Sequence, residues 1–365
     1  MELFVTLTSG AKKSFPVNQF RAFPLLPTMC ISPTMKRELK RRKDDFDIVH
    51  THGYWTMTSV YPHYLKQANG GKRPIVISAP RGQFSKWALA RSKWKKKLMW
   101  LAFQKHALQQ VDCFHATGQK ELQEIRDHGY RQPIALIPNG IDVVKEECSA
   151  NNFARLLAEC DAIPQSLGSH DRRVLLFLGR IHPVKGLDEL LLSWNELSTQ
   201  FRDWDLVICG PGEKQDVEKI KSLALETRAQ RVHFVQGLYG RNKHALYQRA
   251  DLYVLPSHTE NYGMTVAESL AAATPVVTTT GTPWTRLGQQ GCGWTIKLGR
   301  SELTSTLNQA MSCSRQRLEE MGELGRQWML DEFGWHALAA QMAAVYDWLL
   351  AEQPQHERPE YVDVV

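Results

Sequence analysis

The sequence predicts a protein of two doubly wound α/β domains, and three observations carry this prediction. The chain has 365 residues, which is about two domains at roughly 100–200 residues each. Short apolar segments rich in β-branched and aromatic residues alternate with longer amphipathic segments. Most of the apolar segments in the second half end near a glycine or a proline. Segments that are apolar throughout predict parallel strands covered by helices on both faces.

The elements follow from this alternation. In the second half we expect strands at residues 174–178, 205–209, 232–235, 252–255 and 275–278, and helices at 187–200, 214–228, 243–249 and 265–273. In the first half we expect strands at 4–8, 46–49, 75–78, 113–116 and 134–137, and helices at 55–68, 94–110 and 119–128. A polar linker is expected over 146–171, and a fraying tail from residue 354. The predicted domains are residues 1–165 and 166–333, with a helix at 334–353 that crosses back to the N-terminal domain.

Composition limits the class of protein. Hydrophobic residues make up 43% and charged residues 23%, so two cores can form without disulfides or structural metals. The net charge of +7 favours an anionic partner, such as a nucleotide, a phospholipid surface or nucleic acid, without choosing among them. The seven cysteines are scattered, with no C-x-x-C, which suits a reducing compartment. No apolar stretch reaches the ~18–20 residues that span a bilayer, and the N-terminus lacks secretory-signal features, so a cytoplasmic protein is expected.

The densest motif runs from residue 255 to 268. A strand ends at Leu255, a turn carries Glu260, and a helix begins near Gly263. The first amides of a helix have no partner inside it and lie at its positive end, which suits a phosphate or sugar oxygens. Glu268 could accept hydrogen bonds from two neighbouring hydroxyls, as on a ribose. The alternative is an ordinary strand–turn–helix crossover with two solvated glutamates. The other candidate donor-binding residues of this motif are Asn261, Tyr262, Met264 and Thr265.

A second motif lies at residues 177–186, where Gly179 and Arg180 follow an apolar strand and Lys185 comes a turn later. Two cations at a strand end could clamp a pyrophosphate, Arg180 with its fork geometry and Lys185 as a point charge. They could equally be solvated surface charges. Glycine turns end the next two strands, and each could accept a nucleotide or simply be a turn; they contain Gly210, Gly212 and Gly237.

In this order the motifs resemble those of the retaining glycosyltransferases of family 4, also called group 1. The resemblance covers residues 45–349 and is strongest at 177–283. Its hallmark is a glutamate, seven residues and a second glutamate, here Glu260 and Glu268. The resemblance implies the GT-B fold, in which two Rossmann-like domains face a central cleft.

The same resemblance implies the chemistry. The donor would be an NDP-sugar, with Arg180 and Lys185 on the pyrophosphate and Glu268 on the ribose. Glu260, in a supporting role, would hold the sugar together with the amides of residues 263–265. The expected enzyme is a retaining glycosyltransferase that needs no metal and no cofactor, because cationic side chains and the helix dipole stabilise the leaving diphosphate.

The first half resembles a subgroup of the family that acts in bacterial polysaccharide and lipopolysaccharide assembly. The matching segments are residues 50–55, 78–82 and 137–142, with 281–284 in the second half. A glycan or lipid-linked acceptor is implied, and the acceptor-side candidates are His52, Gly53 and Arg81. Many relatives have a histidine at the position of Arg81. An arginine cannot act as a base near neutral pH and favours a phosphate or an acidic acceptor. His52 could face the cleft or be a packed or capping residue.

One difference from the family qualifies this expectation. Relatives usually have a strand, a glycine-rich loop and a helix before the strand that corresponds to residues 4–8. We expect this first unit to be missing here, which would leave the N-terminal domain truncated. The alternative function is therefore a catalytically impaired relative that binds an NDP-sugar without transferring it. A nucleotide-sugar 2-epimerase of the same fold is disfavoured by the two-glutamate spacing.

The segment from Lys86 to Trp100 mixes lysines with tryptophans. Such a segment can lie on an anionic membrane, and would place the protein peripherally at the inner face of the cytoplasmic membrane. Because Trp94, Leu98 and Leu101 share helical spacing, they could equally be core positions of a surface helix. No nucleic-acid partner is expected.

Overall fold

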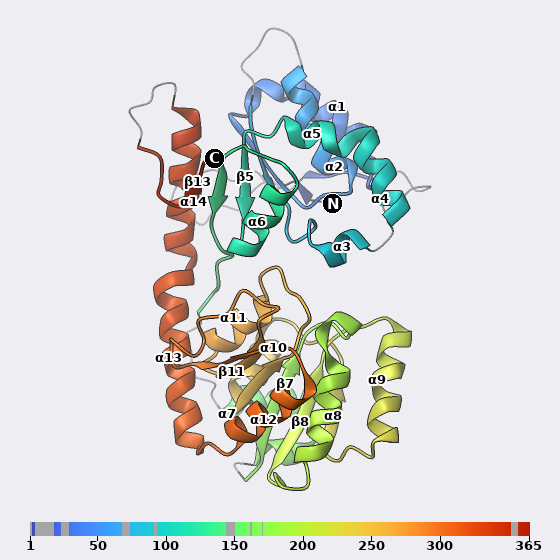
Figure 1. The fold of residues 1–365 in the computed structure, drawn as a ribbon, viewed down its shortest axis with the longest axis vertical. Helices are drawn as coiled ribbons and strands as arrows, with labels where there is room; N and C mark the ends of the chain where they lie inside the picture. Colours follow the sequence, from blue (N-terminus) through green and yellow to red (C-terminus); the bar gives the residue numbers. More distant parts are fainter. Residues whose placement is uncertain are drawn as a thin grey trace. The chain divides into compact units, whose positions relative to one another are not determined.

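The structure is a computed structural model that describes residues 2–3, 18–22, 29–67, 74–90, 93–143, 150–160, 163–169, 171–351 and 357–365. The chain divides into two compact units, residues 1–138 with 338–365 and residues 139–337. Each is an α/β unit built on its own sheet (Figure 1). The strand predicted at residues 4–8 lies outside the described residues.

The second unit has a six-stranded parallel sheet in the order β12-β11-β10-β7-β8-β9. Taken in chain order from β7, this is the 3-2-1-4-5-6 order of a doubly wound dinucleotide-binding fold. All residues of β8 and β10 are buried, as expected for strands that helices cover on both faces. The strands are β7 (Arg173–Leu178), β8 (Trp204–Cys209), β9 (Val232–Val235), β10 (Leu252–Leu255), β11 (Val276–Thr279) and β12 (Gly293–Ile296).

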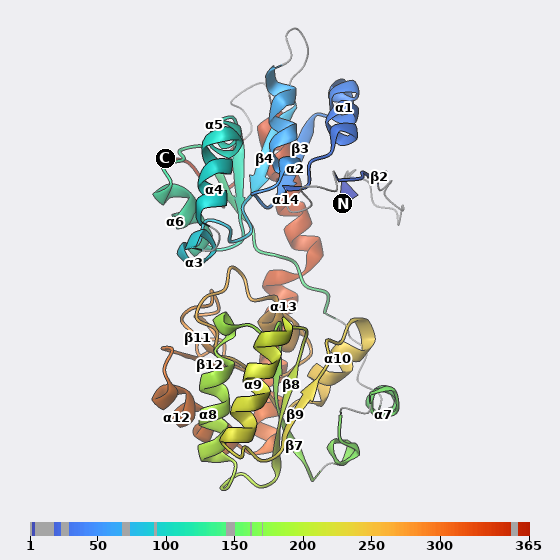
Figure 2. The same cartoon turned by 90° about the vertical axis from the view of Figure 1, so that its right-hand side faces the viewer.

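Helices cover both faces of this sheet, and Figure 2 shows α8 and α9 side by side in front of β7, β8 and β9. Trp194 and Trp204 are fully buried in the core beneath them. On the other side α13 packs closely on α11, because Gly322 of α13 lies against the Ala273 carbonyl. The helices are α7 (Ala150–Glu159), α8 (Leu187–Leu197), α9 (Lys214–Glu226), α10 (Gly240–Arg249), α11 (Met264–Ala271), α12 (Arg300–Met311) and α13 (Arg315–Phe333).

The segment predicted as a linker, residues 146–171, contains α7. Phe153 and Leu156 of this helix are buried in the core of the second unit, together with Ile163 and Leu167. The units accordingly divide between residues 138 and 139, and not at the predicted boundary of 165. The apolar residues that anchor α7 are spaced among polar ones, which is why the segment reads as a linker in the sequence.

The first unit has a five-stranded sheet in the order β13-β6-β5-β4-β3. The four strands β3–β6 run parallel, and short β1 and β2 pair separately. Its strands are β1 (Glu2–Leu3), β2 (Asn18–Gln19), β3 (Ile48–His52), β4 (Ile75–Ala79), β5 (Cys113–Ala116), β6 (Ile134–Leu136) and β13 (Val362–Asp363). Its helices are α1 (Pro33–Arg41), α2 (Met57–Val60), α3 (Lys86–Ala90), α4 (Lys93–Met99), α5 (Lys105–Gln109) and α6 (Gln119–Asp127).

The end of the chain is an ordered part of the first unit. Helix α14 (Trp335–Leu350) buries Leu338 and Val345 in a cluster with Ile77 and Ala135 of that sheet. The tail, predicted to fray, forms β13, which pairs antiparallel with β6. Val362 is 1% exposed, and this burial explains why a short polar-looking tail is held in place.

Candidate functional site

Two loops of the second unit come together where the strand order reverses. Strands β7 and β10 are neighbours in the sheet, while the strands that follow each of them run outward on opposite sides. Open α/β sheets bind ligands at the carboxyl ends of the strands at such a switch point. The Val184 carbonyl accepts hydrogen bonds from the His258 amide at 2.8 Å and from the Ser257 hydroxyl at 2.9 Å. The two predicted motifs therefore form one site.

Lys185 and Glu260 lie at the centre of this site. The Lys185 Nζ is 2.5 Å from the Glu260 Oε1, and both side chains are mostly buried, at 15% and 13% exposed. Gly186 allows the approach, because its φ is +67° and a Cβ there would lie 2.2 Å from the Pro256 carbonyl oxygen. Arg180 is exposed just after β7 and forms no ion pair in the part of the chain that the structure describes.

Two aromatic residues, Tyr262 and Trp284, support the turn before α11 through hydrogen bonds. The Trp284 Nε1 donates to the Tyr262 carbonyl at 2.6 Å, and the Tyr262 hydroxyl donates to the Asn139 carbonyl at 2.9 Å. Gly263 has a φ of +76° and no side chain caps the helix that follows. The side chain of Tyr262 thus supports the turn. Asn261, Met264 and Thr265 follow Glu260 closely in the sequence, and all three residues are partly exposed.

Glu268 is held by two residues that the sequence did not single out. Its Oε1 accepts from the Lys243 Nζ at 2.7 Å, and its Oε2 accepts from the Tyr247 hydroxyl at 3.1 Å. Lys243 and Tyr247 are four residues apart on α10, which starts directly after the glycine turn that contains Gly237. In the sequence, the four-residue spacing of Lys243 and Tyr247 next to the Gly237 turn was the signal that could have identified these two residues. Both candidate glutamates of the hallmark are therefore paired with lysines.

The predicted glycines join neighbouring strand ends. The Gly179 amide donates to the Cys209 carbonyl at 3.0 Å, and a Cβ on Gly210 would lie 1.8 Å from the Gly179 carbonyl oxygen. Only glycine fits this approach at Gly210. Gly212 bridges to Ile181, and Gly237 lies against Pro211. The carboxyl ends of β7, β8 and β9 are thereby brought side by side.

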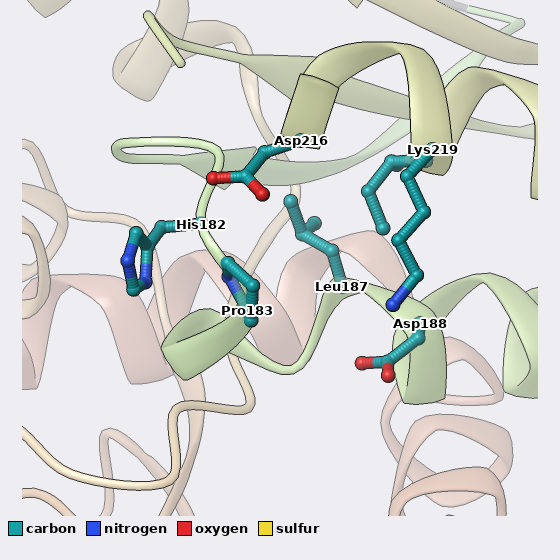
Figure 3. A pocket seen from close by; sticks show the side chains of 7 residues that line it. His182, Pro183, Leu187, Asp188, Asp216 and Lys219 are labelled. Atoms are coloured by element: carbon teal, nitrogen blue, oxygen red, sulfur yellow. The ribbon is translucent and has the colours of Figure 1, made fainter. Parts of the chain in front are cut away.

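A small cavity of about 20 Å³ lies next to this site, at the start of α8 and α9 (Figure 3). His182, Asp188, Asp216 and Lys219 are among the residues that line it. A cavity of this size holds about one water molecule, so it is not a nucleotide site. The His182 Nδ1 accepts from the Val184 amide at 3.1 Å and caps the short turn after β7.

In the first unit, the three acceptor-side candidates also meet at strand ends. The Gly53 amide donates to the Ala79 carbonyl at 2.8 Å, which ties the end of β3 to the end of β4. Arg81, two residues after β4, has an unusual φ of +55°. Its Nε and Nη2 lie 3.2 and 3.0 Å from the Nδ1 of His52. His52 is thus a partner of Arg81 and not a core residue, since it is exposed at the end of β3.

Behind this pair is a chain of polar residues that the sequence analysis missed. The His50 ring stacks on the His52 ring, with centroids 4.5 Å apart. The His50 Nδ1 is 2.9 Å from the Tyr346 hydroxyl of α14, and its Nε2 is 3.3 Å from the His115 Nδ1. The spacing of His50 and His52 along one strand was a signal, but His115 and Tyr346 come from distant segments.

These imidazoles are neutral at physiological pH. Although the His52 side chain is partly open to solvent, loss of hydration around its ring, and secondarily the charge of Arg81, lowers its pKa to about 4. Burial and the same charge lower the pKa of His115 to about 3. Burial also lowers the pKa of His50, well below its usual range. Arg81 is consequently a cation surrounded by uncharged rings.

The segment from Lys86 to Trp100 forms part of an exposed apolar surface. The alternative of core-facing positions is wrong for three of its candidates, since Trp94, Leu98 and Leu101 are 70%, 63% and 69% exposed. Met99, by contrast, packs in the core beneath. Among the described residues, no helix has the length and apolar character needed to cross a membrane.

Two family models of glycosyltransferases match this chain. Residues 160–328 match the family model described as glycosyl transferases group 1. Residues 6–145 match the model described as glycosyltransferase family 4. One match falls mostly on each unit, and together the two matches support a group 1 glycosyltransferase of GT-B type.

Individual relatives are distant. The D-inositol 3-phosphate glycosyltransferase of Actinosynnema mirum is 25% identical over 67% of this chain and 58% of its own length. A GDP-mannose-dependent alpha-(1-6)-phosphatidylinositol monomannoside mannosyltransferase of Mycolicibacterium smegmatis is 30% identical over 57% of this chain and 54% of its own. The chain spans about half the length of the curated relatives it matches first.

Solved structures confirm the predicted fold class. Sucrose-phosphate synthase of Thermosynechococcus elongatus superposes with a TM-score of 0.73 at 20% identity, over 92% of this chain and 83% of that one. Anabaena HepE in complex with UDP and glucose gives a TM-score of 0.70 at 15% identity, over 87% and 82%. The protein therefore has two parallel-sheet α/β domains of the GT-B type.

Proposed function

We propose that this protein transfers a sugar from an NDP-sugar to a glycan or lipid-linked acceptor, with retention of configuration and without a metal ion or cofactor. The observation that carries the proposal is the pairing of Lys185 with Glu260 at the switch point of the sheet, with Glu268 on the helix that follows. A bound diphosphate can separate Glu260 from Lys185 and form an ion pair with Lys185 in its place.

Each residue of the site has a role in this proposal. Glu268, oriented by Lys243 and Tyr247, accepts hydrogen bonds from the ribose hydroxyls. Lys185, Arg180 and the first amides of α11 bind the diphosphate, and their positive charge stabilises it as it leaves. Glu260 then faces the sugar and stabilises the positive charge that develops at the anomeric carbon.

In the proposed reaction the configuration is retained without a covalent intermediate, and each bond and proton is accounted for. The bond between the anomeric carbon and the diphosphate oxygen breaks, and the acceptor oxygen forms its bond on the same face. The acceptor proton passes to the leaving diphosphate oxygen. Glu260 carries charge but takes no covalent part, which is consistent with the ion pair that it forms with Lys185.

The relatives suggest where to look for substrates. One is named for GDP-mannose and a solved neighbour for UDP and glucose, so both nucleotides are donor candidates. A role in bacterial polysaccharide or lipopolysaccharide synthesis, in the cytoplasm, remains our proposal for the acceptor. The alternative is a relative that binds the NDP-sugar but is impaired in transfer.

One assay can distinguish a transferase from an impaired relative. It measures the release of nucleoside diphosphate from UDP- and GDP-sugars, with water as the acceptor. A transferase is expected to hydrolyse one donor slowly, and Glu260→Gln is expected to slow this hydrolysis roughly 10²–10³-fold. Donor binding without any release, with or without added acceptor glycans, would favour the impaired relative.

We also propose that the exposed surface around α4 contacts an anionic membrane, where lipid-linked acceptors are found. Trp94, Leu98 and Leu101 supply apolar area, and the exposed Lys97 adds positive charge. Vesicles of phosphatidylglycerol and phosphatidylcholine test this by cosedimentation. Leu98→Ser should weaken binding about tenfold or more, since one leucine contributes about 1.5–3 kcal/mol when fully inserted.

A matched control is available in the second unit. Leu225 of α9 is 78% exposed but lies outside this surface, so Leu225→Ser should leave vesicle binding unchanged. Equal loss in both variants, or equal binding to neutral vesicles, would contradict the proposed membrane contact.

A further inference from the structure

A tight turn after β4 brings Gln83 to the end of β3. The Gln83 amide donates to the Pro80 carbonyl at 3.3 Å, and the two residues between them, Arg81 and Gly82, have φ values of +55° and +75°. A positive φ at both central residues is the pattern of a type I′ turn. The carboxylate of Glu121, which is 1% exposed, accepts from the Gly82 amide at 2.5 Å and fixes the turn from inside the unit.

The side-chain amide of Gln83 has a defined orientation. Its Oε1 accepts from the Tyr54 amide at 2.5 Å, and because a backbone N–H can only donate, the atom that faces it is the oxygen and not the nitrogen. The Nε2 lies 3.2 Å from the position that a Cβ on Gly53 would take. Tyr54 and Phe84 are buried, with ring centroids 5.0 Å apart, so the residues that flank this contact are anchored. The two N–H groups of Gln83 are therefore held beside the backbone of Gly53.

These N–H groups are open to a ligand. The Gln83 Nε2 has no acceptor in the part of the chain that the structure describes, and the side chain is only half-buried. Gly53, with a φ of +78° and no Cβ, leaves the backbone beside it accessible. Open α/β sheets bind ligands at the carboxyl ends of their strands, where β3 and β4 place this group. The first unit thus presents a fixed, uncharged pair of donors at the edge where a ligand is expected.

We propose that Gln83 determines specificity for the acceptor, by donating to the carbonyl oxygen of an acetamido group on the acceptor sugar. The inference rests on the proposed function for the word acceptor. A carbonyl oxygen has two lone pairs and no hydrogen, so it matches N–H groups alone. A sugar hydroxyl also has a hydrogen to donate, whereas the Gln83 oxygen is already bonded to the Tyr54 amide. A sugar with a hydroxyl in place of the acetamido group is accordingly the weaker ligand.

The test observes the Gln83 side chain directly in the full chain, by nitrogen-15 NMR of labelled glutamines, with Gln83→Glu used for assignment. The methyl glycosides of N-acetylglucosamine and N-acetylgalactosamine are titrated beside those of glucose, galactose and glucuronic acid. We expect saturable shifts of the Gln83 side-chain signals with at least one acetamido sugar, at an affinity about fivefold or more above that of its parent glycoside, the loss of one or two neutral hydrogen bonds. Equal affinity for the parent glycoside, tighter binding of the glucuronide, or no response to any sugar would overturn the proposal.

A matched pair of variants separates recognition from folding. Gln83→Glu keeps an oxygen for the Tyr54 amide but replaces the N–H donors by a second oxygen, so the turn has the same internal hydrogen bond. The affinity for the acetamido sugar, followed on its acetyl methyl signal, should fall about tenfold or more. Gln109→Glu makes the same change at an exposed position of the same unit and should bind like the wild type. Thermal unfolding checks that both variants are folded, and equal affinity of the two folded variants would contradict a role for Gln83.

The outcome is independent of the donor site. In Glu268→Ala, where nucleotide binding is expected to weaken, the Gln83 shifts with the acetamido sugar should persist. If the wild type binds no nucleotide but Gln83 still responds to the acetamido sugar, the proposed transferase fails and the sugar site stands. If a nucleotide binds and Gln83 responds to none of the sugars, the sugar site is wrong and the transferase stands.

Discussion

The charged side chains at the carboxyl ends of the two sheets have different partners. In the second unit, Glu260 and Glu268 are each paired with a lysine, so acid and base are balanced within the protein. In the first unit, Arg81 lies beside imidazoles whose pKa values are lowered, so the rings next to this cation are uncharged. The difference is that the glutamates of the second unit are held by lysines, whereas the cation of the first unit is held by neutral rings.

The two ends also differ in how their residues are held. In the second unit the site is made by loops of a single sheet, which the strand order brings together. In the first unit, His50 is held by Tyr346, which is 296 residues away on α14. The first unit therefore depends on the end of the chain, whereas the second does not.

The largest expected effect is on chemistry at Glu260. Glu260→Gln keeps the size of the side chain but removes the charge that stabilises the sugar cation. We expect donor hydrolysis to fall roughly 10²–10³-fold, as for loss of one preorganised electrostatic group. Nucleotide affinity should change little. Glu213→Gln, an exposed residue before α9, is the control. A loss below about threefold would place the role of Glu260 in structure only.

The next effect is on stability at the strand ends. Gly210→Ala forces a Cβ to within 1.8 Å of the Gly179 carbonyl oxygen, so the ends of β7 and β8 must separate. We expect the free energy of unfolding to fall by about 3 kcal/mol, at the upper end for overpacking. Gly288→Ala, where nothing lies near the new Cβ, should change it little. Denaturant unfolding measures both, and equal stability of the two variants would contradict the close approach.

The stability of the first unit should depend on pH through its buried histidines. The pKa of His115 is about 3 in the folded protein, below its unfolded value near 6.5, so the unfolded state binds more protons as the pH falls. Stability from His115 is complete above about pH 7 and is lost as the pH falls through about 6.5 toward 3. At about pH 5 the loss is about 2 kcal/mol, with His50 and His52 adding in the same direction.

Replacing His115 tests this. His115→Gln keeps a donor for the Ile137 carbonyl but cannot be protonated. Urea unfolding of the wild type should show stability falling steeply between about pH 7 and about pH 5, and the variant should show a shallower fall. Identical slopes would mean that His115 is not the neutral, buried group that the structure shows.

The smallest expected effect is at Lys243. Lys243→Met removes one of the two groups that hold Glu268, while the Tyr247 hydroxyl remains. A partly exposed ion pair contributes at most about 1 kcal/mol, so nucleotide affinity should weaken about fivefold or less. Lys214→Met, on a side chain that is 90% exposed, should have no effect. A loss of about 100-fold would instead make Lys243 a direct ligand of the nucleotide.

Much of the fold could be predicted from the sequence, because the second unit alternates buried strands and helices in a regular way. The strands at 232–235 and 252–255 are confirmed at both ends. Other elements were missed for physical reasons. Helix α7 is anchored by a few apolar side chains, and β13 is short and held by a single buried valine. The helix predicted at 55–68 contains Pro62, and the structure has α2 followed by a 3-10 helix there.

The candidate site was predictable in part. Glu260, Lys185 and the glycine turns lie on contiguous motifs, so their joint position follows from the order of the strands. The partners of Glu268 and of His52 depend on contacts between distant segments. Lys243 carried only the weak signal of its helical spacing with Tyr247 beside a glycine turn. His115 and Tyr346 carry no local pattern, and a single sequence gives no reason to select them.

The most direct test of the central claim is isothermal titration of the full chain with UDP, GDP and their sugars, beside Glu268→Ala and Glu226→Ala. Glu226, at the exposed end of α9, is a carboxylate outside the site. We predict that one nucleotide binds the wild type and Glu226→Ala equally, and binds Glu268→Ala about 10–100-fold more weakly, the loss of charged hydrogen bonds to a ribose. No binding by folded wild type, or equal binding by all three proteins, would contradict the assignment of the donor site.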